Sequence, residues 1–196
     1  MKRSGFKGPT RQAGSAAVEF SLVAMIFFTL IFATLELARI EYLFNTLEES
    51  TRRAAAAAAN VDYRDAAAME KIQADAVFRD SAGPLALGDP VTSANIKIDY
   101  LWLSKADWDL KHMSTLPACP AGNRSKCMTN PQADTCIRFV RARVCASMDA
   151  ATGNCERLPY KMVFPFLNLT GMKVPTAETI VPAGSLGAVI GAIPCT

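Results

Sequence analysis

An unbroken apolar stretch near the start of the chain constrains its fold more than any other feature. Between Phe20 and Leu35 no side chain is charged, and the wider segment 15–37 contains only Glu19 and Glu36, one near each end. An α-helix rises ~1.5 Å per residue and the hydrocarbon core of a bilayer is ~30 Å thick, so about 20 residues span it. The 23 residues of segment 15–37 therefore predict a helix that can cross a membrane.

Positive charge is concentrated before this helix. Residues 1–14 hold four cations and no acid, so they contribute +4, although the formal net charge of all 196 residues is only +3. The remainder has 17 basic and 18 acidic residues, so it lacks the basic excess that nucleic-acid binding requires. The positive-inside rule places residues 1–14 in the cytoplasm and the chain beyond about residue 40 outside, with membrane lipid around the helix.

Two simpler explanations of this segment remain open. A secretory signal peptide also begins with basic residues, but its apolar core usually has ~7–15 residues and precedes a small-residue cleavage site. Here the core is longer, and the following "TLELARIEY" offers only the weak site "ELA". A plain signal anchor fits the length and the charges. Neither explanation accounts for Glu19, because an acid within a membrane segment costs about 2.5–3.5 kcal/mol on insertion scales.

A free amine close to Glu19 would offset this cost. If the chain is cut between Gly14 and Ser15, Ser15 becomes the N-terminal residue and Glu19 the fifth. The ammonium and the carboxylate can then neutralise one another within one subunit or between two. In the second arrangement an unpaired carboxylate in lipid is penalised, so the pair selects the axial register of a helix bundle. We therefore interpret Glu19 as an assembly residue.

The junction resembles that of a known family. A basic leader, Gly14, three small residues, and then Glu19 and Phe20 opening an apolar helix, in the form "GSAAVEFSLV", resemble the class III (prepilin) signal of TadE-like proteins. These are minor pilins or pseudopilins of tight-adherence (Flp-type) pili, which serve surface attachment. The resemblance covers roughly residues 11–60, including "TRRAAAAAAN".

The resemblance implies processing, partners and location. It implies cleavage after Gly14 by a membrane-embedded prepilin peptidase, retention of the helix in the mature protein, and contact with other pilins or pseudopilins and the pilus assembly machinery. It also implies a single-pass protein of a bacterial inner membrane, with a cytoplasmic N-terminus and a periplasmic C-terminal domain. Because major Flp pilins are very short, the roughly 150 residues beyond the membrane favour a minor, initiating or accessory component.

The helix is expected to continue beyond the membrane. Residues 15–59 contain no proline and no glycine, and Glu48–Arg52 and Glu49–Arg53 are favourable i,i+4 pairs. An apolar stripe along this part is expected to pack either on the protein's own globular part or on a neighbouring subunit; it consists of Leu37, Ile40, Leu43, Phe44 and Leu47. The run Ala54–Ala59 is explained by helix propensity alone.

The remaining chain predicts an α+β domain. Residues 60–84 read as a second helix, capped by Asp62 and reaching about Asp80, followed by a turn-rich linker. Its predicted apolar side consists of Ala66, Met69, Ala74, Val77 and Phe78. Residues 85–196 are expected to form a β-rich domain outside the cytoplasm.

Period-two patterns predict the strands of this domain. In "NIKIDYLWL" one face carries Ile96, Ile98, Tyr100 and Trp102. "CIRFVRARVCA" has arginines on both faces, which predicts an edge strand or a partly covered one. "YKMVFPF" and "ETIVP" are shorter candidates, placed at edges or stopped by proline. The apolar tail "GSLGAVIGAIP" is too short to span a bilayer and is expected to dock on the domain.

Six cysteines lie in the part expected outside the cytoplasm, where thiols are oxidised. No C-x-x-C is present, and the spacings do not suit a zinc site, so structural disulfides are predicted. Fifteen pairings are possible; if Cys136 and Cys145 end one strand they lie too far apart to bond each other. Cys195 is expected to tie down the tail. The candidates are Cys119, Cys127, Cys136, Cys145, Cys155 and Cys195.

The sequence carries no catalytic signature. His112 is the single histidine and is expected on the surface of a loop, and Asp107 and Asp109 alternate in the same loop without forming a paired-carboxylate site. No phosphate-binding, dinucleotide-binding, G-x-S-x-G or H-E-x-x-H motif is present. We therefore predict no enzyme activity, no cofactor and no metal. The alternatives are a membrane-anchored binding module outside any pilus and, less favoured, a processed secreted enzyme.

Overall fold

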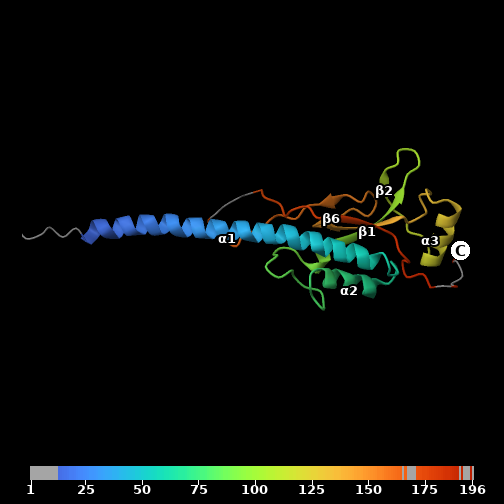
Figure 1. The fold of residues 1–196 in the computed structure, drawn as a ribbon, viewed down its shortest axis with the longest axis horizontal. Coiled ribbons are helices and arrows are strands. Elements are labelled where there is room, and N and C mark those ends of the chain that lie inside the picture. Colours follow the sequence, from blue (N-terminus) through green and yellow to red (C-terminus); the bar gives the residue numbers. More distant parts are fainter. Residues whose placement is uncertain (1–12, 165, 167–170, 190, 192–194, 196) are drawn as a thin grey trace, which may run out of the picture.

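One long helix runs through most of the molecule (Figure 1). The computed structural model describes residues 13–164, 166, 171–189, 191 and 195. Helix α1, Ala13–Ala58, has 46 residues and is therefore about 69 Å long. Its N-terminal half projects from the rest of the chain, whereas its C-terminal half lies against the folded domain (Figure 1). The prediction of a long helix that continues beyond the apolar stretch is thus confirmed, with its end at Ala58.

The second helix is shorter than predicted. Helix α2, Ala66–Ala76, begins after Asp65, whose carboxylate accepts a hydrogen bond from the backbone N–H of Ala68 at 3.0 Å. The predicted cap, Asp62, instead accepts hydrogen bonds from the backbone and the guanidinium of Arg64. The helix ends near Val77, and Phe78 adopts a positive φ of 60°. The prediction of Asp62 as the cap and of a helix reaching Asp80 was therefore wrong.

Only part of the predicted apolar side of α2 faces the core. Ala74 and Val77 are buried and Met69 is half-buried, but Ala66 and Phe78 are exposed. Phe78 lies instead under the guanidinium of Arg53 on α1, 4.5 Å from ring centre to Cζ.

The sheet has four antiparallel strands in the order β2-β1-β3-β6. Strand β1, Ile96–Leu103, and β6, Glu178–Pro182, occupy predicted segments, and Pro182 ends an edge strand as expected. Strand β2, Leu110–His112, is short, and the 3-10 helix η1, Ser93–Asn95, leads into β1. Residues 160–164 of "YKMVFPF" form no strand, so that prediction was wrong.

Strand β3, Phe139–Val144, is a central strand. The edge interpretation of "CIRFVRARVCA" was therefore wrong, whereas partial covering is confirmed. Val140, Ala142 and Val144 are buried, and α1 packs against β3 and β6. Arg141 and Arg143 lie on the opposite face of β3. The chain then continues directly into a small hairpin formed by β4, Ser147–Met148, and β5, Cys155–Glu156.

The core lies between the C-terminal half of α1 and the sheet. Five apolar side chains of α1 are completely buried there: Leu43, Leu47, Ala54, Ala55 and Ala58. The alanine run therefore provides a smooth packing face as well as helix propensity, which the sequence analysis missed. On the solvent side Glu49 pairs with both Arg52 and Arg53 at 2.7 Å, so the predicted Glu48–Arg52 pair is replaced by Glu49–Arg52.

All six cysteines form disulfides, as predicted: Cys119–Cys195, Cys127–Cys136 and Cys145–Cys155. Cys136 and Cys145 flank β3 and do not bond each other, and Cys195 ties the tail to the N-cap of helix α3, Pro120–Thr129. The tail also docks through Leu186, which is buried and whose N–H donates to the carbonyl of Ala59 at 3.0 Å. The predicted fold class, a long apolar helix followed by a disulfide-stapled α+β domain, is confirmed.

Candidate functional site

The N-terminal half of α1 presents an apolar surface that the described part of the chain leaves almost uncovered. From residue 14 to 35 nearly every side chain is exposed, including Phe20 at 75% and Val23 at 66%. The most apolar 18-residue window of this helix has a mean hydropathy of 2.2, and none of it is buried. In length and composition the helix is able to cross a membrane as a single-pass anchor.

The predicted processing and assembly residues lie at the start of this surface. Ser15 Oγ donates a hydrogen bond to Glu19 Oε1 at 3.3 Å, so residue 15 and the carboxylate one helical turn later are within direct reach. Both side chains are exposed, as is Phe20. A Cβ added to Gly14 would meet no atom within 4 Å. The packing of this chain therefore gives no reason for a glycine at position 14.

Three hydroxyls within the apolar half are satisfied by the helix itself. Ser21, Thr29 and Thr34 donate to backbone carbonyls three or four residues earlier, at 2.9, 2.7 and 2.7 Å. No hydroxyl proton among these three needs water, so the polar residues of the segment are compatible with lipid.

The exposed half ends at a buried carboxylate that the sequence analysis treated only as a boundary. The Glu36 side chain is 3% exposed and accepts hydrogen bonds from the Tyr160 hydroxyl at 2.5 Å, the Val163 N–H at 3.2 Å and Arg39 at 3.3 Å. Two of these three partners, Tyr160 and Val163, come from a loop more than 120 residues away in the chain. No local pattern predicts such a contact. The only signal in the sequence was an acid and a base three residues apart, Glu36 and Arg39.

The apolar stripe that follows divides between two environments. Leu43 and Leu47 are completely buried against the domain, as one of the two alternatives predicted. Leu37 and Phe44 remain 59% and 45% exposed on another side of the helix. The stripe therefore serves the protein's own core only in part.

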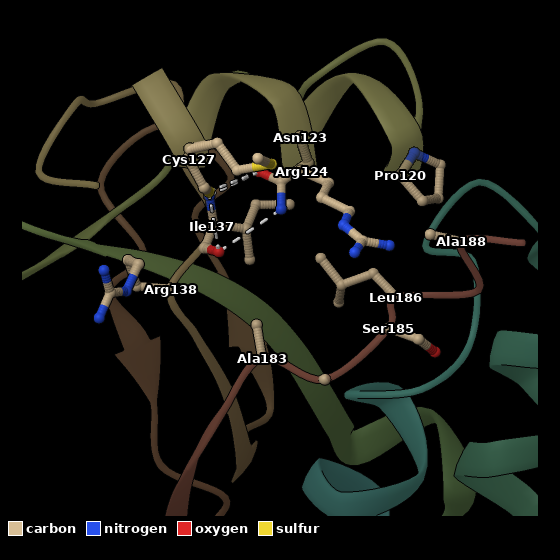
Figure 2. A pocket seen from close by; sticks show the side chains of 12 residues that line it. Pro120, Asn123, Arg124, Cys127, Ile137, Arg138, Ala183, Ser185, Leu186 and Ala188 are labelled. Carbon is tan, nitrogen blue, oxygen red and sulfur yellow. Dashed lines mark hydrogen bonds between the residues drawn. The ribbon is translucent and has the colours of Figure 1, made fainter. Parts of the chain in front are cut away.

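A pocket lies at the far end of the domain from the apolar helix. It has a volume of about 410 Å³ and is formed by α3, the residues just before β3, and the tail. Figure 2 shows Arg124 reaching from α3 over Leu186 and Ser185, while Arg138 lies at the opposite side and points away. Asn123 Oδ1 accepts a hydrogen bond from the Ile137 N–H at 2.8 Å and so stabilises the wall of the pocket. Two disulfides, Cys119–Cys195 and Cys127–Cys136, hold these segments together.

His112 is not a surface residue on a loop, so that prediction was wrong. It lies in β2 with 12% of its side chain exposed; Nδ1 is 3.1 Å from Asp99 Oδ2 and Nε2 is 2.9 Å from the Ala150 carbonyl. Asp99, 2% exposed, also receives Arg141 at 2.6 Å and Arg143 at 3.5 Å. Both ring nitrogens are hydrogen-bonded, so this cluster holds the 149–154 loop over the sheet.

The two aspartates near His112 are separate from it. Asp107 pairs with Lys111 at 2.7 Å, and hydrogen bonds from Lys111 and Ser104 lower the pKa of Asp107 to about 2. Asp109 accepts a hydrogen bond from the Leu110 N–H. Within the described residues no group of three or more His, Cys, Asp or Glu side chains is arranged to hold a metal ion.

Comparison with protein families identifies the segment that carries the candidate site. A long helix that is apolar over its exposed half fits a single-pass membrane anchor. Residues 14–56 match the family described as TadE-like protein, which confirms the resemblance seen at Gly14–Phe20. The match begins at Gly14 and ends within the buried half of α1. Neither the curated proteins nor the solved structures yielded a match to this chain.

Proposed function

We propose that this chain is a minor pilin or pseudopilin of a Flp-type (tight-adherence) pilus, processed after Gly14 by a prepilin peptidase. The observation that carries the proposal is the family match that begins at Gly14, together with an apolar helix surface that the chain leaves uncovered. In this role α1 is inserted in the inner membrane and then packs beside the helices of other pilins, while the disulfide-stapled domain lies in the periplasm.

The geometry at the helix start supports a role of Glu19 in assembly. After cleavage the α-amine belongs to residue 15, whose side chain already reaches the Glu19 carboxylate within 3.3 Å. Pairing of the ammonium and the carboxylate removes most of the penalty of about 2.5–3.5 kcal/mol for an acid in a membrane segment. In a bundle the same pairing between neighbours sets how far one helix is displaced along the next.

The absence of steric need at Gly14 supports recognition by an outside partner. Because no atom of the described chain lies near a Cβ at this position, the glycine is explained more simply by a peptidase that must approach the backbone closely. Three disulfides in the domain agree with an oxidising compartment, and four cations before the helix agree with a cytoplasmic start.

Mass spectrometry tests the processing step. We expect the protein purified without reduction from membranes that contain a prepilin peptidase to begin at Ser15 and to be six hydrogens lighter than its reduced form. Gly14→Leu should leave the leader attached, whereas Gly8→Leu, within the leader, should be cleaved normally. A mature chain that still begins at Met1 would reduce the protein to a simple anchor, and one that begins beyond residue 35 would identify a signal peptide.

A second experiment separates a pilin from a tethered binding module, the alternative for which the pocket beside Arg124 is the candidate site. Glu19→Ala should abolish or strongly reduce pilus formation while carbonate extraction still finds the protein in the membrane. Glu41→Ala removes an equal charge from an exposed position beyond the apolar segment and should assemble normally. Normal piliation of Glu19→Ala would favour the tether.

A further inference from the structure

Two loops of the domain close around α1 where its exposed half ends. They are residues 84–90 and residues 160–164 with 166, here called the collar. The second loop reaches along α1 as far as Phe32, in its N-terminal half. Lys161 of one loop and Asp89 of the other form an ion pair at 2.7 Å, so the two loops also contact each other.

Aromatic contacts place the collar alongside the apolar segment. The rings of Phe164 and Phe166 lie 4.6 and 5.6 Å from the ring of Phe32, measured between centroids. If a ~30 Å hydrocarbon core begins at Phe20, its outer edge falls near Arg39 and Phe32 is ~10 Å inside it. If the core begins at Ser15, Phe32 still lies a few ångströms inside. The tip of the collar therefore reaches the depth of the outer leaflet in either register.

Side chains of α1 form hydrogen bonds with backbone groups of the collar that would otherwise be hydrogen-bonded to water. Arg39 donates to the carbonyls of Leu87 at 2.9 Å, Lys161 at 2.7 Å and Asp89. Tyr42 donates to the Ala86 carbonyl at 2.9 Å, and Glu36 accepts from the Val163 N–H at 3.2 Å. Irregular backbone is tolerated beside lipid only when its polar groups are satisfied by protein, and five such groups are satisfied here.

The collar turns apolar side chains outward rather than inward. Leu87 is 78% exposed, Val163 56% and Phe166 58%. Leu87 adopts a φ of 56°, a left-handed conformation that is uncommon for leucine, and it does so without burying its side chain in the domain. The charged Lys161 and Asp89 and the aromatic Tyr160 accompany these residues, which is the composition of a membrane interface.

We propose that the collar is a lipid-binding surface beside α1: Leu87 and Val163 lie at the headgroup boundary of the outer leaflet, and Phe166 enters the outer edge of the hydrocarbon core next to Phe32. The inference rests on the proposed membrane insertion of α1 and adds a second point of contact between the domain and the bilayer. Because the collar is bound to α1 through Glu36 and Arg39, it fixes the tilt of the domain and the depth of the helix. Apolar continuity with the exposed half of α1 favours lipid over a protein partner as the occupant.

Depth-dependent fluorescence quenching tests this proposal on the full chain in phosphatidylcholine nanodiscs that hold one copy each. Single Val163→Trp and Leu87→Trp variants are compared with the wild type, whose Trp102 and Trp108 supply the background to subtract. The lipids carry a nitroxide either near the headgroup or near the chain end. Phe28→Trp reports insertion of the helix, and Met128→Trp on the distal α3 is the matched exposed control.

We expect Val163→Trp and Leu87→Trp to be quenched by headgroup-proximal nitroxides, Phe28→Trp by chain-end nitroxides, and Met128→Trp by neither. Quenching of Phe28→Trp without quenching of either collar variant would overturn the collar proposal and leave membrane insertion standing. No quenching of Phe28→Trp would overturn both. If the collar variants become shielded from aqueous iodide only in discs with several copies, the occupant is a neighbouring subunit and the lipid proposal fails.

A charge variant gives an independent readout. In the same discs Val163→Glu should shift the quenching depth of Phe28→Trp, because an unpaired carboxylate at the edge of the hydrocarbon core is costly and moves outward, which lifts the collar and the helix bound to it. Arg124→Glu, on the distal pocket, should leave that depth unchanged. Unreduced intact mass confirms that each variant retains its three disulfides, so a null result is not a folding failure. An unchanged depth with Val163→Glu would contradict the proposal.

Discussion

The two halves of α1 have the same backbone and opposite surroundings. From residue 14 to 35 the helix carries large apolar side chains, such as Phe20 and Val23, that nothing in the described chain covers. From about residue 43 to 58 it carries leucine followed by alanine and small hydroxyl residues, and one side is completely buried on the sheet. Large side chains thus face a medium outside the molecule over the whole first half, whereas two leucines and then alanines face the domain core in the second.

The difference follows from what each half packs against. A helix can approach its neighbours closely only if its facing residues are small, and Ala54, Ala55 and Ala58 are completely buried in the half of α1 that packs against α2, β3 and β6. Fluid lipid and neighbouring helices can accommodate large side chains, and contact with their large apolar area is favourable. The halves also differ in charge, because residues 20–35 carry no charged side chain and residues 36–53 carry seven.

The largest expected effect comes from paired leucines in the two halves. Leu47→Ala should lower the free energy of unfolding of the domain by about 2.7–5 kcal/mol, because it leaves a cavity in a fully buried site. Leu22→Ala, at a 54% exposed position, should change it by less than about 0.5 kcal/mol. Denaturant titration of the full chain in detergent, followed by Trp102 fluorescence, measures both. Equal losses would show that the exposed half is part of the domain's cooperative unit.

Two glutamates of the same helix provide the next contrast. Glu36→Ala removes the acceptor of Tyr160, Arg39 and the Val163 N–H, and should destabilise the domain by about 2–3 kcal/mol because buried donors lose their partner. Glu19→Ala should give the same denaturation curve of the domain as the wild type. If Glu36→Ala leaves the stability of the domain unchanged, water replaces the carboxylate, and the boundary between the halves is not fixed by this contact.

Alanines on opposite sides of the buried half give a smaller effect. Ala55→Leu forces extra volume between α1 and the sheet and should cost about 1–3 kcal/mol of unfolding free energy. Ala56→Leu, one residue further and exposed, makes the same chemical change without the clash and should be nearly neutral. Thermal unfolding of the two variants is sufficient to compare them. Tolerance of leucine at position 55 would remove the steric explanation of the alanine run.

The smallest effect concerns pH on the solvent side of the buried half. The hydrogen bond from Arg53, aided by Arg52, lowers the pKa of Glu49 below its ordinary value of 4.5. The ionised form is thus favoured by the fold, so its contribution is present above pH 4.5 and disappears as the pH falls through the lowered pKa. Glu49→Gln should be slightly less stable than wild type at pH 7 and indistinguishable in strong acid. Glu48→Gln, whose expected pair with Arg52 does not form, serves as the control, and a constant difference at every pH would refute this assignment.

Local sequence patterns were sufficient to predict the structure wherever the structure of a segment depends on that segment alone. The apolar length of 15–37, the junction at Gly14–Phe20, the alternation in β1 and the even number of cysteines all predicted what the structure or the family match confirms. In each case the relevant forces act within a few residues or depend on composition. The cap of α2 shows the limit: both Asp62 and Asp65 are suitable N-cap residues, and in the structure Asp65 caps the helix while Asp62 accepts from Arg64.

The sequence by itself determined that this protein has an exposed apolar helix and an oxidised α+β domain, because hydrophobic length and cysteine number require no knowledge of contacts. Only the tertiary structure decided which cysteines pair, that β3 is central, that His112 and Asp99 hold a loop, and that Glu36 is buried beneath the collar. Each of these joins residues far apart in the chain. Their energies depend on where the sheet and α1 place those residues, which no local pattern encodes.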